Sequence, residues 1–121
     1  MPLTIFTSDR FADHLTPPGH PERAERAEAM QHVVSGWRKR GGEVEEAGFA
    51  TDEQLARVHD REYIGLIRET AGRAVALDPD TFTSPDSHDV ARLAAGAAGG
   101  AGDHVLHWPR PRALAVVRPP G

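Results

Sequence analysis

The sequence predicts an α/β fold with a parallel sheet of about three strands joined by crossover helices. Short β-prone or apolar segments stand at residues 3–7, 43–47 and 113–117, and helical segments lie between them. Strands that alternate with helices are typical of right-handed crossovers and parallel sheets. Such a small sheet leaves edges unpaired, so we expect the fold to be incomplete as an isolated domain and to self-associate through these edges.

The composition limits the classes of protein to consider. The 121 residues carry a net charge of −4 and contain no cysteine, which excludes disulfides, thiolate metal ligands and cysteine nucleophiles. No basic region leads into an apolar stretch at the N-terminus, and no apolar segment approaches the roughly 20 residues that span a bilayer. We expect a single domain over residues 1–121, a cytoplasmic location, and no nucleic-acid or membrane partner.

Local signals define the first strand and the first helix. Residues 3–7 are β-prone and precede a polar loop at residues 8–19. A proline in the first turn and acidic residues near the positive helix end predict a helix that begins at His20-Pro21-Glu22 and ends at Gly41-Gly42. Its expected buried stripe consists of Ala24, Ala27, Met30, Val34 and Trp37.

Two short helices are expected after the weakly apolar strand at residues 43–47. Thr51 or Asp52 is a suitable cap for a helix that runs to Val58. Asp60 is a suitable cap for a second helix that runs to about Gly72. Residues 73–85 have no periodic pattern and are expected to form a loop.

A fourth, longer helix is predicted to open with Ser84 as its cap and Pro85 at its first position. It carries an apolar stripe that includes Val90 and Leu93. The glycines at positions 99, 100 and 102 each cost about 1 kcal/mol of helix stability relative to alanine. We therefore expect this helix to fray or break before Val105.

Residues 113–117 form an unbroken apolar run between Pro111 and Pro119. Such a run predicts a strand buried on both faces, in the middle of a parallel sheet. It leads into Arg118-Pro119-Pro120-Gly121, a rigid turn at the carboxyl end of the strand. Open α/β sheets build their sites at the carboxyl ends of strands, so this turn is predicted to form part of one.

Seven histidines supply candidates for a metal or catalytic site. His14 and His20 flank the loop after the first strand, where they either line a site or anchor the loop by hydrogen bonds, and anchoring is favoured. His59 precedes a capped helix and is expected to be buried and hydrogen-bonded. His104 and His107 suit one helix face, but no third ligand stands beside them, which favours a solvated helix end.

Three aspartates, Asp78, Asp80 and Asp86, lie in or beside the loop at residues 73–85. They lack the spacing and the central glycine of a calcium-binding loop. Helix capping and turn formation account for Asp78 and Asp86, whereas Asp80 has no such local role and remains a candidate site residue. No nucleophile elbow, P-loop or GxGxxG motif is present. The spacing of the candidate residues alone therefore does not identify a reaction.

Five segments that cover nearly the whole chain form a recognisable series. They are Phe11-Ala12-Asp13-His14; His20-Pro21-Glu22-Arg23 with Arg26; Leu55-Ala56-Arg57-Val58-His59-Asp60-Arg61-Glu62-Tyr63-Ile64; Asp80-Thr81-Phe82-Thr83-Ser84-Pro85-Asp86-Ser87 running into Ala94-Ala95-Gly96; and Val117-Arg118-Pro119-Pro120-Gly121. In this order and spacing they resemble the zinc-dependent histone deacetylase superfamily. Within that superfamily they resemble bacterial members, including acetylpolyamine amidohydrolases and acetoin-utilisation proteins.

The resemblance implies an arginase-like α/β domain around a parallel sheet whose first strands lie side by side. It also implies that the intact enzyme is a zinc-dependent amidohydrolase that hydrolyses N-acetyl amides on acetyl-lysine or an acetylpolyamine. The acetylated amine would then be its substrate partner. Ala24 departs from the family pattern, which usually has proline there, and this change should loosen the entry into the helix.

The resemblance also assigns candidate pocket and channel residues. Arg26 matches an arginine of the inner channel below the zinc, where it is thought to help acetate leave. Asp80 falls in the loop where family members use an aspartate to hold the substrate backbone at the rim. The remaining candidates line one pocket wall or belong to the strand end and floor: His14, His20, Arg118 and Gly121.

The family motif that matches Arg118-Pro119-Pro120-Gly121 is followed by a histidine pair, then by the zinc ligands and a catalytic tyrosine. The single tyrosine of this chain, Tyr63, matches an early helix instead. We therefore expect the N-terminal portion of a deacetylase that has no catalytic residue, metal ligand or cofactor of its own and is inactive alone. The alternative is a non-catalytic α/β module used for binding or assembly.

Overall fold

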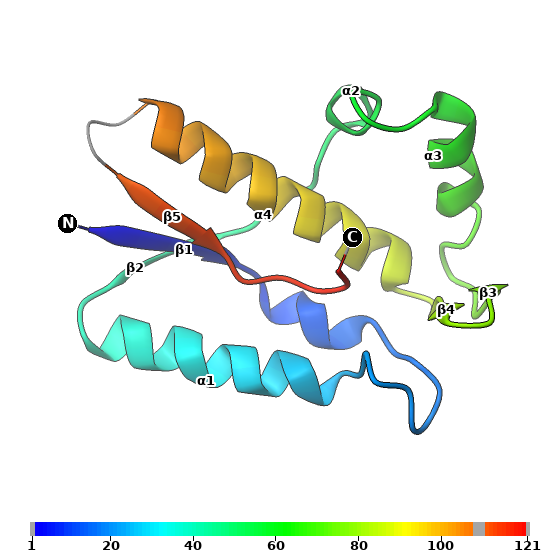
Figure 1. The fold of residues 1–121 in the computed structure, drawn as a ribbon, viewed down its shortest axis with the longest axis horizontal. Helices are drawn as coiled ribbons and strands as arrows, with labels where there is room; N and C mark the ends of the chain where they lie inside the picture. The colour runs from blue at the N-terminus through cyan, green and yellow to red at the C-terminus, as the bar shows by residue number, and fades with distance from the viewer. Residues whose placement is uncertain (1, 108–110, 121) are drawn as a thin grey trace.

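The computed structural model describes residues 2–107 and 111–120 and has an α/β fold (Figure 1). Strand β1 (Leu3–Thr7) lies between β2 (Glu43–Glu46) and β5 (Arg112–Ala115), and both neighbours run parallel to it. Ile5 stands opposite Val44 on one side and Leu114 on the other. The predicted α/β class, with a three-stranded parallel sheet among the described residues, is confirmed.

Helices α1 (Glu25–Lys39) and α4 (Ser87–His107) lie on opposite sides of the sheet (Figure 1). Phe6 points toward α4, where its ring lies 5.7 Å from the ring of His104. Side chains alternate along a strand, so Ile5 points toward the other face, and it is fully buried there. On the α4 side of the sheet, the core contains Phe11, from the loop after β1, and four residues of α4: Val90, Leu93, Ala94 and Ala97. Three partly buried residues pack against this cluster: Phe6, Ala115 and Val117.

Strand β5 is not buried on both faces, contrary to the prediction from its apolar run. Helix α4 packs on one face of β5. Leu114 on the other face is 47% exposed, because α1 packs on β2 at the far side of the sheet. Among the described residues, β5 pairs only with β1. The apolar run therefore forms an edge strand of the described sheet, with one face covered by α4 and the other partly exposed.

The sequence predicted that α1 begins at His20, but the helix begins at Glu25. The backbone N–H of Glu22 donates to Nδ1 of His20 at 3.0 Å, and this local bond favours a turn over a helix. At the other end Gly41 has a φ of +82°, which ends the helix as predicted. Ala27 and Val34 of the expected stripe are buried, and its other members are partly buried.

Helix α4 is continuous, so the predicted break before Val105 is wrong. Two of its glycines let other segments approach closely. A Cβ atom on Gly96 would lie 1.8 Å from the carbonyl oxygen of Gly48, and one on Gly100 would lie 3.3 Å from the ring of Phe6. These contacts compensate for the low helix propensity of glycine.

The start of α4 also differs from the prediction. The helix begins at Ser87, two residues after Pro85. The hydroxyl of Ser84 does not cap the helix, because it accepts the backbone N–H of Leu15 at 2.9 Å. Ser84 thus joins α4 to the first loop of the chain, which lies 69 residues earlier.

Helices α2 (Asp52–Leu55) and α3 (Arg61–Arg68) are shorter than predicted. Thr51 caps α2 through a capping box, in which its hydroxyl accepts the N–H of Gln54 and the Gln54 side chain accepts the N–H of Thr51. The chain leaves the helical conformation before Val58. After α3 it passes through turns to Gly72, which has a φ of +77°.

Two local predictions beside α3 are wrong. His59 is exposed rather than buried, and its ring lies 5.3 Å from the ring of Tyr63. Asp60 occupies the N-cap position, but its side chain makes no capping hydrogen bond. Both residues lie at the surface.

Three small elements were not predicted. A 3₁₀ helix, η1 (Asp9–Asp13), begins the first loop, and an antiparallel hairpin of β3 (Ala76–Asp78) and β4 (Thr81–Phe82) stands where a loop was expected. The hydroxyl of Thr83 accepts the N–H of Val75 at 3.0 Å and closes the base of this hairpin. Elements this short have no periodic pattern from which they could be identified.

The substitution Gly96→Ala should destabilise the protein by several kcal/mol, because its methyl group would overlap the backbone of Gly48. Gly99→Ala is the matched control on the same helix. A methyl group there meets no atom within 4 Å, so this change should stabilise the protein by about 0.5–1 kcal/mol. Urea denaturation of the two variants measures both effects, and equal stabilities would contradict the close approach.

Candidate functional site

A cleft of about 590 Å³ opens at the carboxyl ends of β1 and β5. Its walls come from the first loop, α3, the β3–β4 hairpin, α4 and the residues that follow β5. Most of its lining is apolar, and includes Leu55, Ile64, Ile67, Phe82, Ala94 and Val117. Mostly apolar clefts with a few polar groups are typical of small-molecule sites.

The candidate residues from the sequence occupy different parts of this cleft. His14, His20 and Asp80 line it, together with Pro119 and Pro120. Arg118 is buried beneath the lining and is only 2% exposed. Gly121 lies outside the described residues.

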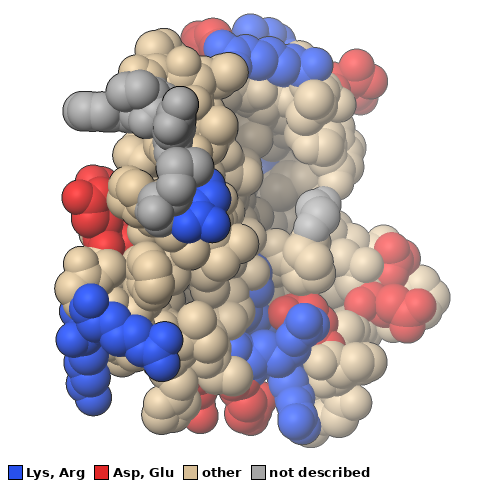
Figure 2. Space-filling model, turned by 60° about the vertical axis from the view of Figure 1, so that its left-hand side comes forward, with Lys and Arg blue, Asp and Glu red and all other residues tan. Residues whose placement is uncertain are grey.

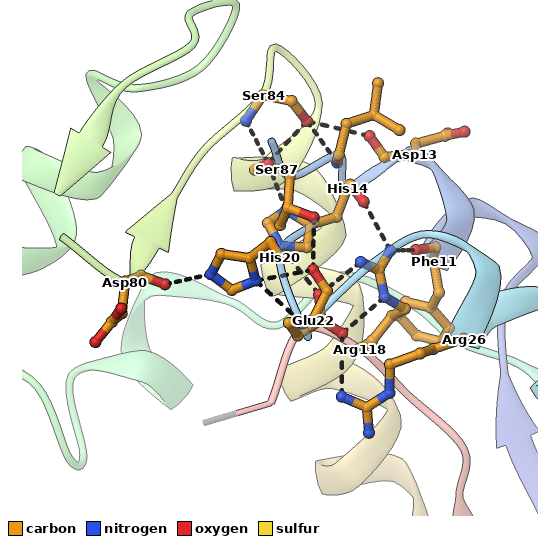
Figure 3. Close-up of polar contacts among 12 residues, drawn as sticks. Phe11, Asp13, His14, His20, Glu22, Arg26, Asp80, Ser84, Ser87 and Arg118 are labelled. Atoms are coloured by element: carbon orange, nitrogen blue, oxygen red, sulfur yellow. Dashed lines mark hydrogen bonds and ion pairs between the residues drawn. The ribbon is translucent and has the colours of Figure 1, made fainter. Parts of the chain in front are cut away.

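Arg118 connects three segments of the chain (Figure 3). Its Nε donates to Oε1 of Glu22 at 3.0 Å and its Nη2 donates to Oε2 at 2.6 Å, which makes a bidentate ion pair. Its Nη1 donates to the backbone carbonyls of Phe11 and His14. The end of β5 is thereby fixed to the first loop and to the turn before α1.

His14 lies beside this ion pair. Its Nδ1 is 2.7 Å from Oγ of Ser87, and its Nε2 is 3.6 Å from Oε2 of Glu22. Burial lowers the pKa of His14, and the positive charge of Arg118 lowers it further. The carboxylate of Glu22 raises that pKa and nearby His20 lowers it, but the net direction is downward. The neutral form of His14 is therefore the main one at pH 7.

His20 connects the turn before α1 to the hairpin. Because its Nδ1 accepts the N–H of Glu22, its Nε2 carries the proton and donates to the backbone carbonyl of Asp80 at 2.7 Å. Its ring also packs edge-on against Phe82, with centroids 5.6 Å apart. The sequence favoured loop anchoring by His14 and His20 over a place in a site. Both make such anchoring hydrogen bonds and both also line the cleft, and their role in a site stays a prediction.

Asp80 is held through its backbone. Its N–H donates to Oδ1 of Asp78 at 2.8 Å, and this bond, with those from Thr81, holds the pKa of Asp78 below its usual value. The carboxylate of Asp80 points away from His20 (Figure 3). It has no hydrogen bond or ion pair within the described part of the chain, so it can contact a ligand at the rim of the cleft.

Arg26 lies outside the cleft lining. Its side chain is 59% exposed, and its Nη1 is 3.8 Å from Oε1 of Glu22, on the side away from His14. The channel role that the resemblance implies for Arg26 stays a prediction.

Sequence reasoning missed three members of the polar network: Glu22, Ser84 and Ser87. Glu22 was assigned to the positive end of a helix, yet it is the partner of Arg118, 96 residues away. Ser84 was assigned to a helix cap, and Ser87 had no assignment. A buried ion pair between distant segments has no local sequence signal. Glu22, Ser84 and Ser87 could be singled out only because they lie in the segments that resemble the family motifs.

The described residues, 2–107 and 111–120, contain no group of three or more His, Asp or Glu side chains that could hold a metal ion. Nδ1 of His107 lies 2.8 Å from the backbone carbonyl of Asp103, and His104 packs on Phe6. Lys, Arg, Asp and Glu side chains stand in small separate groups over one face of the molecule, and no continuous basic stripe crosses that face (Figure 2).

Comparison with known proteins identifies the family. The sequence pattern of the histone deacetylase domain matches residues 20–121. The chain belongs to the histone deacetylase family. It is 36% identical, over 85% of its length, to a histone deacetylase-like amidohydrolase of Pseudomonas aeruginosa. It is also 36% identical, over 78% of its length, to a polyamine deacetylase of Mus musculus.

The histone deacetylase relatives are much longer than this chain, which spans 28% of the Pseudomonas aeruginosa protein and 16% of the mouse protein. Among solved structures, the HD domain of HDA15 superposes with a TM-score of 0.85 at 24% identity, over 99% of this chain and 36% of that one. This likeness supports the fold. In the described parts of this histone deacetylase family member, no helix is long and apolar enough to cross a membrane.

The buried ion pair can be tested by a double-mutant cycle. Glu22→Leu or Arg118→Met alone should destabilise the protein by about 3–5 kcal/mol, because each leaves one buried charge without its partner. The combined variant should cost about 1–3 kcal/mol less than the sum of the two. Arg26→Met, at an exposed position beside the same carboxylate, should cost less than about 1 kcal/mol. Additive costs in urea denaturation would contradict the pairing.

The lowered pKa of His14 predicts how stability depends on pH. An unfolded histidine binds its proton near pH 6.5, whereas folded His14 binds it only at lower pH. Between these two values the unfolded state holds more protons, so stability rises with pH. This contribution is fully present above about pH 6.5 and is lost as the pH falls toward the folded pKa. His14→Gln should flatten that slope in denaturation midpoints measured from pH 5 to 8; an unchanged slope would contradict the assignment.

Proposed function

We propose that this chain is the N-terminal portion of a zinc-dependent deacetylase that hydrolyses N-acetyl amides of lysine or a polyamine. The family membership supports the reaction class. The observation that carries the proposal is the cleft at the carboxyl ends of β1 and β5, where residues from all five matching segments meet. On this proposal the chain supplies one wall and part of the floor of the acyl pocket.

The chemistry of the cleft suits an acetylated amine. Its lining is mostly apolar and matches the aliphatic arm of lysine or of a polyamine. Asp80 stands at the rim with a carboxylate that accepts hydrogen bonds from a substrate amide or amine. His14 is neutral at pH 7 and adds no positive charge to the wall that faces a cationic substrate.

The described residues do not fit a zinc site, because no three suitable side chains come together. On this proposal the zinc ligands and the catalytic histidines belong to parts of the family domain that this chain does not span, and the 121 residues alone do not hydrolyse the substrate. The cytoplasmic location expected from the sequence stays a prediction.

A chimera tests the proposed function. The segment of the Pseudomonas aeruginosa amidohydrolase that this chain matches would be replaced by residues 1–121. The chimera should bind zinc and deacetylate an acetyl-lysine peptide or an N-acetylpolyamine, because the transplanted wall and floor complete the pocket. A chimera that also carries Arg118→Met should lose turnover, since the floor is no longer fixed.

The isolated chain is the second arm of this experiment. With zinc and the same substrates it should show no turnover above a control that contains a chelator. Turnover by the isolated chain would contradict the inactivity. A chimera that folds and binds zinc but hydrolyses neither substrate would contradict the deacetylase assignment and favour the non-catalytic module.

A further inference from the structure

The donors and acceptors around Ser87 limit where protons can lie on the cleft wall. Oγ of Ser84 accepts the N–H of Leu15 at 2.9 Å and donates to the carbonyl of Asp13 at 3.3 Å. Oγ of Ser87 accepts the N–H of Ser84 at 2.7 Å. Oγ of Ser87 also lies 3.0 Å from Oγ of Ser84. The single proton of the Ser87 hydroxyl goes either to that oxygen or to Nδ1 of His14 at 2.7 Å, so the two serines are compatible with both neutral forms of the His14 ring.

The other nitrogen of His14 faces a carboxylate. Its Nε2 is 3.6 Å from Oε2 of Glu22, too long for a hydrogen bond but within the range of electrostatic attraction. A carboxylate attracts an N–H and repels a ring lone pair. Because the ring is neutral, it holds one proton, and this geometry puts that proton on Nε2.

Glu22 can impose this choice because its own position is fixed. Both of its oxygens accept hydrogen bonds from Arg118, at 3.0 and 2.6 Å, and its side chain is only 14% exposed. The peptide carbonyls that complete the arginine's bonds come from the same loop that carries His14. Arg118, Glu22, His14 and Ser87 thus form one continuous polar chain from the end of β5 to the start of α4 (Figure 3).

We infer that Glu22 is a positioning residue of the cleft: held by Arg118, it sets His14 as the Nε2–H tautomer, whose Nδ1 accepts the proton of Ser87. This arrangement fixes the orientation of the His14 ring on the cleft wall and ties the wall to α4. The inference goes beyond the proposed function, because it holds whether or not an acetylated amine is the substrate.

Nitrogen-15 NMR of the histidine side chains in the full 121-residue chain tests this inference. The signals of His14 are identified by their loss in His14→Gln. The wild-type ring should show a protonated Nε2 and an unprotonated Nδ1 at pH 7. Ser87→Ala should keep this tautomer, because Glu22 and not Ser87 sets it.

The charge of Glu22 is tested by titrating the same signals. In Glu22→Gln the midpoint of the His14 titration should fall, because an attractive carboxylate is lost while Arg118, Ser87 and His20 remain. Glu25→Gln, at an exposed position three residues along the chain, should leave the midpoint where it is in the wild type.

Three outcomes would overturn the inference. The first is a proton on Nδ1 in the wild type, and the second is a tautomer switch in Ser87→Ala. The third is a folded Glu22→Gln protein whose His14 titrates as in Glu25→Gln. If Glu22→Gln does not fold, the wild-type and Ser87→Ala spectra still decide the question. None of these measurements depends on deacetylation, so failure here and failure of the proposed function are distinguishable.

Discussion

The arrangement of this protein depends on the buried ion pair between Arg118 and Glu22. Burying two charges costs several kcal/mol per ion unless their hydrogen bonds are well satisfied. Here the guanidinium makes two bonds to the carboxylate and two to backbone carbonyls. Among the described residues, every buried side-chain nitrogen or oxygen has a hydrogen-bond partner. The pair can therefore hold a strand end, a loop and a turn in one place without leaving an unpaired charge.

The parallel sheet explains why such a connection is needed. Parallel neighbours are distant in sequence, and β5 pairs with β1 only after more than a hundred intervening residues. Beyond Ala115 the strand ends. The N–H of Val116 then donates to the carbonyl of Phe6, and the hydroxyl of Thr7 donates to the carbonyl of Val116 at 2.8 Å. Without Arg118 the residues that line the cleft would project from a half-exposed edge strand. The open edge and the exposed Leu114 are also the surfaces through which the expected self-association would occur.

The sequence predicted those elements whose signals are local. The strand at residues 3–7, the end of α1 at Gly41 and the cap at Thr51 each follow from a few neighbouring residues, and the structure has them. The predictions that failed needed tertiary contacts. The continuity of α4 depends on Gly48 packing against Gly96, and the exposure of β5 depends on which strands α1 covers. His14, His20, Asp80 and the turn that begins at Arg118 were singled out by residue type and position. Arg26 was found only through the resemblance, and Glu22 was found in the right motif but with the wrong partner.

The same network explains why the cleft wall contains buried polar side chains, although apolar side chains cost less free energy to bury. Replacing a buried ion pair by apolar residues is often neutral or stabilising, so stability alone does not account for Glu22 and Arg118. Apolar side chains at these two positions would still fill space, but they would not hold the carbonyl of His14 or face its ring with a charge. Directional bonds fix the rotation of a ring, which packing alone does only weakly. We interpret the pair as a device that orients the groups at the cleft, and its stabilising effect on the fold as secondary.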